Sequence, residues 1–296
     1  MEIKLDYKYT PLNLDSTLNC GQVFRWIKKD KSWYGIIYGN IIQFRQENTR
    51  LLVNSFPDEF NTLSIQRYLR LDDNLPEIYS RIEVDAVIQQ AVNTLHGLRL
   101  VRQDPWECMI SFICSSFSNI SRIKSMIFNL SRKYGEEIVY NGLTFYTFPS
   151  SATLAKAELH GLLECKLGFR ARYVKEASQM IEEQDINLES YRRIPYREAK
   201  QRLLTIPGIG PKVADCILLF SLDKLEAFPV DVWIKRVLTT YYNQLLPRGV
   251  SSKQKTLTTT CYEYINTFAR AYFGKYAGYA QEYLFHYYRF HDIKPV

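Results

Sequence analysis

Two helical patterns meet at a Gly-rich turn in the segment L-T-I-P-G-I-G-P-K-V-A-D-C-I-L-L-F, which begins at Leu204. The residues before the turn, 196–204, have helical spacing, and Gly208 and Gly210 supply two residues that are free of the Cβ penalty at positive φ. Pro211 suits the start of a second helix. The unsatisfied amides of the turn and of this helix start point outward, so we expect them to bind an anion such as a nucleic-acid phosphate.

This helix-hairpin-helix pattern by itself fits an enzyme and a passive DNA-binding protein equally well. Lys212 favours an enzyme, because a cation in the first turn of a helix opposes the helix dipole and is normally avoided. The positive helix end and partial burial would favour the neutral amine, which is a nucleophile. A solvated Lys that contacts a phosphate is the alternative interpretation.

Asp231 follows Lys212 by nineteen residues, in the run F-P-V-D-V-W-I-K-R. Pro229 ends the preceding segment and Asp is a favoured N-cap, so we expect the Asp231 carboxylate to accept amide hydrogens of a helix that begins at Val232 and to stay ionised. Helix capping alone would explain this residue. A fixed carboxylate would also stabilise a sugar cation that forms near it.

The composition is typical of a well-packed globular protein. The 296 residues are 46% hydrophobic and 14% aromatic, enough for one large core or two domains. The net charge of +7 suits a polyanionic partner, although many proteins without such a partner carry a similar charge. The six cysteines form no C-x-x-C pair, which predicts neither a zinc site nor a disulfide framework. No N-terminal signal and no apolar run long enough to cross a membrane is present in the sequence.

The pattern of the sequence changes near residue 75. Before it, short runs are rich in Tyr, Ile, Phe and Val, and Ser32–Phe44 predicts two antiparallel strands around a turn at Gly39-Asn40. After it, longer periodic segments predict helices over 85–95, 105–114, 120–134, 152–163 and 171–183. We expect an α+β fold, in which an N-terminal antiparallel sheet domain with linking helices (1–108) packs on a larger all-α domain (109–296). A cleft between the two would be the substrate site.

Five segments, in order, resemble those of the 8-oxoguanine DNA glycosylases of the helix-hairpin-helix superfamily. They are G-Q-V-F-R-W from Gly21, V-R-Q-D-P-W-E-C-M-I-S-F-I-C-S-S from Val101, L-G-F-R-A-R-Y-V from Leu167, the region around Lys212, and Y-A-G-Y-A-Q-E-Y-L-F from Tyr276. The resemblance implies a DNA glycosylase and lyase that excises 8-oxoguanine from duplex DNA in base excision repair. It implies no cofactor, and we expect a monomer in the cytoplasm, at a nucleoid or in a nucleus.

The cysteine count separates the chain from one branch of this superfamily. Relatives of the endonuclease III type carry four closely spaced C-terminal cysteines that hold an iron–sulfur cluster. Cys261 is the only cysteine after Cys216 in this sequence, so such a cluster is excluded.

The resemblance assigns the chemistry to two residues and the base pocket to four. Lys212 would attack the sugar C1′ and form a Schiff base, while Asp231 would stabilise the cationic intermediates. The base would be extruded from the helix and read in a pocket. The Gly21 carbonyl would accept its N7–H, Gln281 would read its Watson–Crick edge, and its two faces would contact Cys216 and Phe285. Without the family, these four would be read as a turn, a surface amide and core residues.

Further positions would contact the DNA. Arg122 and Arg170 would bond to the orphaned cytosine, Phe169 would wedge into the base stack, and contacts are also expected from Asn119 and the hairpin glycines Gly208 and Gly210.

Two positions depart from the family pattern. Phe117, in S-S-F-S-N, replaces an Asn, and a phenyl ring can stack or wedge but cannot hydrogen-bond to cytosine. Trp233 stands where the animal enzymes have a His near the 5′ phosphate. These departures keep open a glycosylase of the same fold for another lesion, such as an alkylated purine. A non-catalytic DNA-binding protein is the second alternative, and the presence of both Lys212 and Asp231 argues against it.

Overall fold

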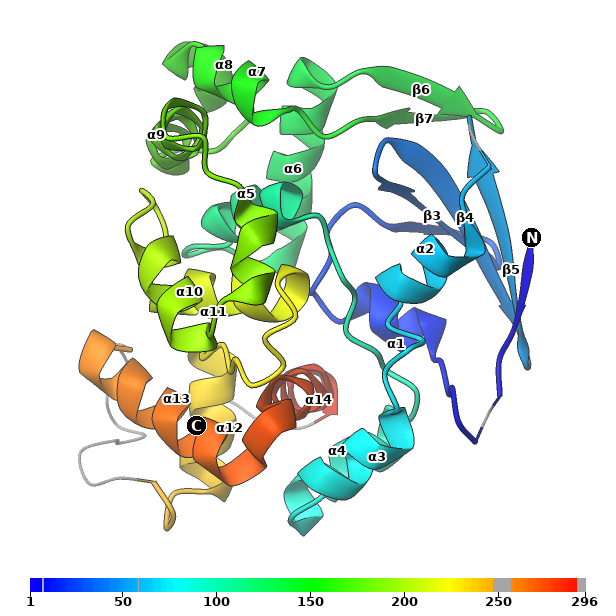
Figure 1. The fold of residues 1–296 in the computed structure, drawn as a ribbon, viewed down its shortest axis with the longest axis vertical. Coiled ribbons are helices and arrows are strands. Elements are labelled where there is room, and N and C mark those ends of the chain that lie inside the picture. Colours follow the sequence, from blue (N-terminus) through cyan, green and yellow to red (C-terminus); the bar gives the residue numbers. More distant parts are fainter. Residues whose placement is uncertain (7, 58, 247–256, 292–296) are drawn as a thin grey trace.

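A five-stranded antiparallel sheet precedes a mostly helical domain in the computed structural model, which describes residues 1–6, 8–57, 59–246 and 257–291 (Figure 1). The expected fold class is thereby confirmed. The sheet has the order β1-β5-β4-β3-β2. Its strands are β1 (Glu2–Lys4), β2 (Ile27–Lys29), β3 (Ser32–Ile37), β4 (Asn40–Glu47) and β5 (Arg50–Phe56).

The helices follow the sheet, except for the short α1. They are α1 (Leu14–Asn19), α2 (Thr62–Tyr68), α3 (Leu75–Ile82), α4 (Ala86–Thr94), α5 (Pro105–Cys114), α6 (Ile120–Tyr134), α7 (Ser151–Lys156), α8 (Leu159–Glu164), α9 (Arg170–Glu183), α10 (Tyr196–Leu204), α11 (Pro211–Ser221), α12 (Val232–Tyr241), α13 (Thr259–Phe273) and α14 (Ala277–His291), with 3-10 turns η1 (Leu188–Arg193) and η2 (Gly274–Tyr276). In the part of the chain that the structure describes, none of them has the length and apolar character needed to cross a bilayer.

Alternating apolar residues hold the sheet together. Leu51 and Val53 of β5 are fully buried, and Val53 pairs with Phe44 of β4. Trp26 stacks on the Phe44 ring at 4.9 Å between ring centroids. The turn between β3 and β4 lies one residue earlier than predicted, at Tyr38-Gly39, because both of these residues adopt positive φ as a two-residue hairpin turn requires.

Two differences from the predicted helices concern residues 137–164. The periodic segment 152–163 forms two short helices, α7 and α8, because Ala157 and Glu158 are extended. The domain predicted as all-α also contains a β-hairpin of β6 (Glu137–Tyr140) and β7 (Leu143–Tyr146), whose Asn141-Gly142 turn is a strong hairpin signal in the sequence. This hairpin lies against β3 and β4, where Phe145 packs with Ile36 and Ile41.

The helices α3 and α4, which link the sheet to the rest, pack on α14 rather than on the sheet. Their buried residues, such as Leu75 and Ile88, therefore join the large core of the helical domain. Within this core α11 packs on both α5 and α10. The helix that begins with the Gly-rich turn is thus held on two sides.

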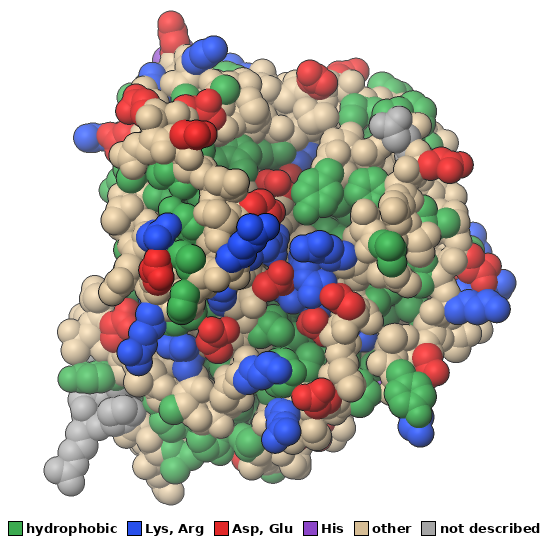
Figure 2. All heavy atoms as spheres, viewed as in Figure 1, with side chains coloured by type: hydrophobic (Ala, Val, Ile, Leu, Met, Phe, Trp, Pro, Cys, Tyr) green, Lys and Arg blue, Asp and Glu red, His purple; other side chains and the backbone are tan. Residues whose placement is uncertain are grey.

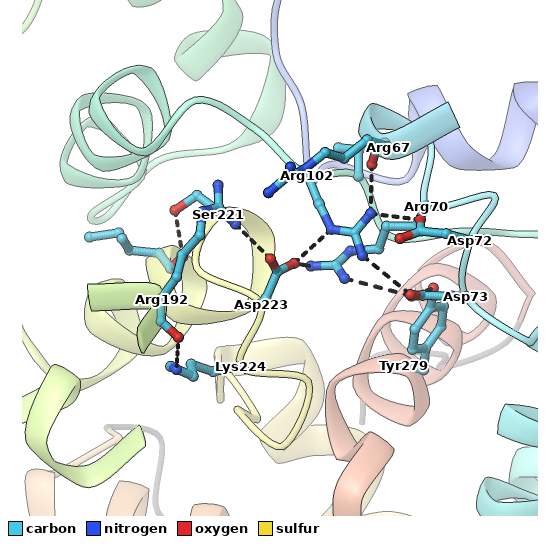
Figure 3. A network of polar contacts seen from close by, with 12 residues as sticks. Arg67, Arg70, Asp72, Asp73, Arg102, Arg192, Ser221, Asp223, Lys224 and Tyr279 are labelled. Carbon is cyan, nitrogen blue, oxygen red and sulfur yellow. Dashed lines mark hydrogen bonds and ion pairs between the residues drawn. The ribbon is translucent and has the colours of Figure 1, made fainter. Parts of the chain in front are cut away.

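A buried ion-pair network joins the sheet side to the end of α11 (Figure 3). Asp223 accepts hydrogen bonds from the guanidinium groups of Arg70 at 2.5 Å, Arg102 at 2.8 Å and Arg192 at 2.8 Å. Burial opposes ionisation, but the charges of Arg70 and Arg102 outweigh it and lower the pKa of Asp223 to about 2. Figure 2 shows basic and acidic side chains intermixed in the middle of this face of the molecule.

Candidate active site

The turn before α11 is built on one glycine in the left-handed region. Gly208 has φ +82, and a Cβ atom there would lie 2.7 Å from the Cβ of Tyr173 on α9, so a larger residue would not fit. Gly210 was expected to need positive φ as well, and this is wrong, because it is the extended N-cap of α11 with φ −96. Gly210 is exposed, and a Cβ there would meet nothing within 4 Å. Its backbone is therefore open to the approach of a ligand.

Lys212, in the first turn of α11, is fixed by the end of α5. Its Nζ donates a hydrogen bond to Ser115 Oγ at 2.8 Å and lies 5.2 Å from the centre of the Phe112 ring. The Ser115 hydroxyl in turn donates to the Phe112 carbonyl at 2.7 Å. Because the single hydroxyl proton is used in that bond, the Ser115 oxygen is left to accept from Lys212.

A buried carboxylate one turn after Lys212 also holds α11 in place. Asp215 is fully buried, and its oxygens accept hydrogen bonds from Tyr196 of α10 at 2.6 Å, from Lys200 of α10 at 3.0 Å and from Asn266 of α13 at 3.0 Å. Tyr262 of α13 also contacts Asp215. These bonds fix α11 against α10 and α13.

Asp231 caps α12, as predicted. Its Oδ1 accepts a hydrogen bond from the Ile234 amide at 2.8 Å. Burial raises the pKa of the Asp231 carboxyl above its usual value, while the Ile234 amide and the Lys212 charge oppose the rise. Backbone amides at the start of α12 and nearby cations thus stabilise the carboxylate form, and one of these cations is the candidate nucleophile, Lys212.

A pocket of about 150 Å³ brings together most of the predicted site residues. It is lined by α5, α6, α11, α14, the start of α12 and the loop between α1 and β2. The predicted residues on its walls are Gly21, Asn119, Lys212, Cys216, Asp231, Trp233, Gln281 and Phe285. Trp233 is half-buried and stacks under the Arg236 guanidinium, 5.0 Å from its ring centre.

The walls of this pocket are close-packed. Gly21 has φ +112, and a Cβ there would lie 2.5 Å from Ile120 Cδ1 and 3.5 Å from the Phe285 ring. Cys216 is 3% exposed, and burial raises the pKa of its thiol to about 12. Gln281 is 5% exposed rather than a surface amide, and its Oε1 has no hydrogen-bond partner among the described residues. The pocket therefore offers an unused acceptor.

A larger open groove of about 870 Å³ adjoins the pocket. Phe117, Arg122 and Gly210 line the groove, and Lys212 and Asp231 line both hollows. The amine and the carboxylate thus lie where the groove meets the pocket.

The aromatic residues beside the groove differ from Arg170 in exposure. Phe117 is 94% exposed and Phe169 is 55% exposed, with ring centroids 6.3 Å apart. Arg170 is 2% exposed, and it donates to the carbonyls of Ser116, Phe117 and Leu167. The guanidinium thus holds the loop that presents Phe117, and the structure does not bring it to the groove.

Two further residues of the site were not predicted from the sequence. Ser115 belongs to the run S-S-F-S-N, in which the sequence predicted roles for Phe117 and Asn119 alone. Glu282 follows Gln281 and also lines the pocket. The identity of neither residue indicates that it faces the site.

Comparisons with known proteins identify the family of the chain. Residues 4–109 match the model of the 8-oxoguanine DNA glycosylase N-terminal domain, and residues 110–258 match that of the HhH-GPD superfamily of base excision DNA repair proteins. The N-glycosylase/DNA lyase OGG1 of Arabidopsis thaliana is 32% identical, over 95% of this chain and 78% of that protein. The N-glycosylase/DNA lyase of Saccharomyces cerevisiae is 29% identical, over 95% of this chain and 85% of that protein.

Solved structures lead to the same group. The Clostridium acetobutylicum 8-oxoguanine glycosylase/lyase, in complex with double-stranded DNA containing cytosine opposite 8-oxoguanine, is 32% identical with a TM-score of 0.85, over 94% of this chain and 92% of that chain. Matches with the 3-methyladenine DNA glycosylase of Archaeoglobus fulgidus, 22% identical with a TM-score of 0.77 over 99% of this chain and 100% of that one, show a shared fold. By sequence and structure, this chain belongs to the 8-oxoguanine DNA glycosylase family within the HhH-GPD superfamily.

Proposed function

We propose that this protein is a bifunctional DNA glycosylase and lyase that removes 8-oxoguanine from duplex DNA in base excision repair. The observation that carries this proposal is the position of Lys212 and Asp231 where an open groove meets an enclosed pocket. An amine and a carboxylate in that place act on the sugar while the base lies in the pocket. The protein works as a monomer, in the compartment that holds the DNA.

The reaction begins when a nucleotide turns out of the duplex and its base enters the pocket. The neutral Lys212 Nζ attacks C1′, the C1′–N9 bond breaks, and its electron pair leaves with the base. Opening of the sugar ring gives a Schiff base between Nζ and C1′. Loss of a C2′ proton then expels the 3′ phosphate by β-elimination. The bond from Lys212 to Ser115 holds the amine in place before the attack.

Asp231 stabilises the positive charge that develops on the sugar and on the Schiff base. The Ile234 amide fixes the carboxylate, so no reorganisation is needed when the charge appears. The pocket supplies base recognition by the Gly21 carbonyl, the Gln281 amide and the faces of Cys216 and Phe285. The Gly21 carbonyl selects a base with N7–H, because ordinary guanine has an acceptor at N7.

Contacts to the DNA backbone come from the groove and the hairpin. The hairpin backbone at Gly208 and Gly210 and the N-terminus of α11 face a phosphate, which the helix dipole favours there. Arg122, which is exposed at the start of α6, and Asn119 lie along the same groove. Phe117 and Phe169 stack or wedge where the base has left the helix.

The experiment is borohydride trapping on duplexes that carry 8-oxoguanine or an alkylated purine. Native protein should trap a covalent complex with the 8-oxoguanine duplex and release the base, and Lys212→Gln should do neither while it still binds the duplex, since phosphate contacts supply most of the affinity. Lys4→Gln, on the exposed edge strand β1, is the matched control. Trapping by Lys212→Gln would remove Lys212 from the mechanism. Faster release of the alkylated purine by native protein would overturn the substrate.

A further inference from the structure

Glu282 is a buried carboxyl group in the base pocket for which the reaction described above has no role. It lies on α14 directly after Gln281, is 2% exposed, and lines the same pocket as Lys212 and Asp231. Acidic side chains are rarely buried to this degree unless they are paired.

The partners of Glu282 are few. Its Oε1 has no hydrogen-bond partner within the described ranges of the chain, and the carboxyl group otherwise contacts the Cys20 thiol. That thiol has one weakly acidic proton, and it also donates to the Thr17 carbonyl at 3.3 Å. A buried carboxylate with so little hydrogen bonding is costly, so the neutral acid is favoured.

The second carboxyl group of the pocket has better partners. Asp231 accepts from the Ile234 amide and faces Lys212, whereas Glu282 has neither kind of contact. Burial and the Asp231 charge raise the pKa of Glu282 to about 7, and Cys20 and Arg289 oppose the rise. When two carboxyl groups share a pocket, unequal surroundings separate them into one that is charged and one that carries a proton.

The ionisable groups around Glu282 come from each neighbouring element. Cys20 lies at the end of α1, Asp231 before α12, and Arg289 two turns further along α14. On α11, Cys216 interacts electrostatically with Glu282, and Lys212 lines the same pocket. On α6, Lys124 interacts with Cys20 and Arg289. Within the described part of the chain Arg289 forms no salt bridge with Glu282, and its charge does not reverse the effect of burial on the pKa of Glu282.

We propose that Glu282 is protonated in the working enzyme and donates a hydrogen bond to a carbonyl oxygen of the extruded base, which makes it a specificity-determining residue. The unused Gln281 Oε1 belongs to a side chain that lines the same pocket and supplies an acceptor. A donor and an acceptor in one pocket can together bind a lactam edge, where a ring N–H stands beside a C=O. An oxidised guanine has such edges, and an alkylated adenine has an amino group in place of the carbonyl. The proposal rests on the proposed function.

The test uses Glu282→Gln, which keeps a donor of the same shape but does not titrate. As Glu282 ionises, we expect the single-turnover rate of 8-oxoguanine excision by native protein to fall relative to the rate of this variant. The ratio of the variant rate to the native rate should therefore rise about tenfold between about pH 6 and pH 8. Glu77→Gln, on the exposed side of α3, is the control and should give a constant ratio.

A second variant shifts the titration without removing the carboxyl group. Cys20→Ala deletes the thiol that stabilises ionised Glu282, so the pH midpoint of the change should move upward. A ratio that is flat or falls with pH for Glu282→Gln would overturn the proposal while leaving the glycosylase function intact. Absence of 8-oxoguanine release by native protein at every pH would instead overturn the proposed function. Melting temperatures of both variants confirm that they fold.

Discussion

Lys212 Nζ donates a hydrogen bond to Ser115 Oγ at 2.8 Å, which joins the first turn of α11 to the C-cap residue of α5. The two residues are 97 positions apart in the sequence. The hydroxyl proton is committed to the Phe112 carbonyl, so Ser115 serves as an acceptor that orients the amine. Placement of the amine thus depends on a residue outside the hairpin.

Replacement of Ser115 by Ala should slow base excision without weakening DNA binding. An ordinary intramolecular hydrogen bond contributes about 0.5 to 1.5 kcal/mol, so its loss should reduce the single-turnover rate by about twofold to tenfold. Borohydride trapping should persist, since Lys212 is intact. Ser80→Ala on α3 is the control, and an unchanged rate in Ser115→Ala would show that the amine needs no orientation by this hydroxyl.

Asp231→Asn should separate the electrostatic role of Asp231 from helix capping. Asn caps helices about as well as Asp, so the melting temperature should stay near the native value, whereas Asp231→Ala should lose about 1 kcal/mol of stability. Both variants lack the charge, and both should slow turnover by about two orders of magnitude or more. A near-native rate in Asp231→Asn would reduce the residue to a cap.

Phe117→Asn should widen the preference for cytosine opposite the lesion. In the native protein we expect excision opposite the four bases to differ by less than about a hundredfold, because each direct contact contributes about 1 to 3 kcal/mol of discrimination and Phe117 supplies none. Phe117 has φ +50, a conformation that Asn adopts more readily than Phe, so the variant should be at least as stable.

Single-turnover rates on four duplexes measure this preference. Phe117→Ala removes the ring without adding an amide, and it should leave the ranking of the opposite bases as it is in the native protein. A native preference of several thousandfold, or an unchanged ranking in Phe117→Asn, would show that this position does not read the orphaned base.

Asp223→Asn should destabilise the fold by at least about 2 kcal/mol near neutral pH, because the pKa of Asp223 is lowered to about 2 by its arginine partners. The folded state favours the ionised form, so this stability is present above about pH 4 and is lost as the pH falls towards 2. The difference between native and variant in urea unfolding should shrink over that range. Asp72→Asn, which removes an exposed carboxylate paired with Arg102, should have little effect. Equal losses of stability in Asp223→Asn and Asp72→Asn would contradict a special role for Asp223.

The sequence predicted the reactive centre because its signals are local. The helix over 196–204, the proline at the start of α11 and the cap at Asp231 all lie where they were expected, since each depends on residues a few positions apart. The one-residue shift of the turn to Tyr38-Gly39 shows the limit of this approach, because pairing of the strands decides which residues take positive φ.

The surroundings of the centre could not be predicted in this way. Arg170 has the same side chain whether it contacts DNA or backbone carbonyls, and its burial depends on a loop 54 residues earlier in the chain. Glu282 and Gln281 are neighbours on one helix, and their place in the pocket depends on the packing of α14 against α12 and α13. Such facts follow from contacts between distant segments, for which no short pattern exists.

The base pocket is assembled from both parts of the chain. Gly21 and Phe24, beside the sheet, close one wall, while Lys212 and Asp231 come from the helical domain. A small displacement between the two parts would alter the shape of the pocket, and so the bases that fit it, before it moved the Lys212 amine. Partial loosening of the protein, by heat or by loss of the Asp223 ion pairs, should therefore produce an enzyme that errs in its choice of base while it still cuts, and loss of fidelity would precede loss of reactivity.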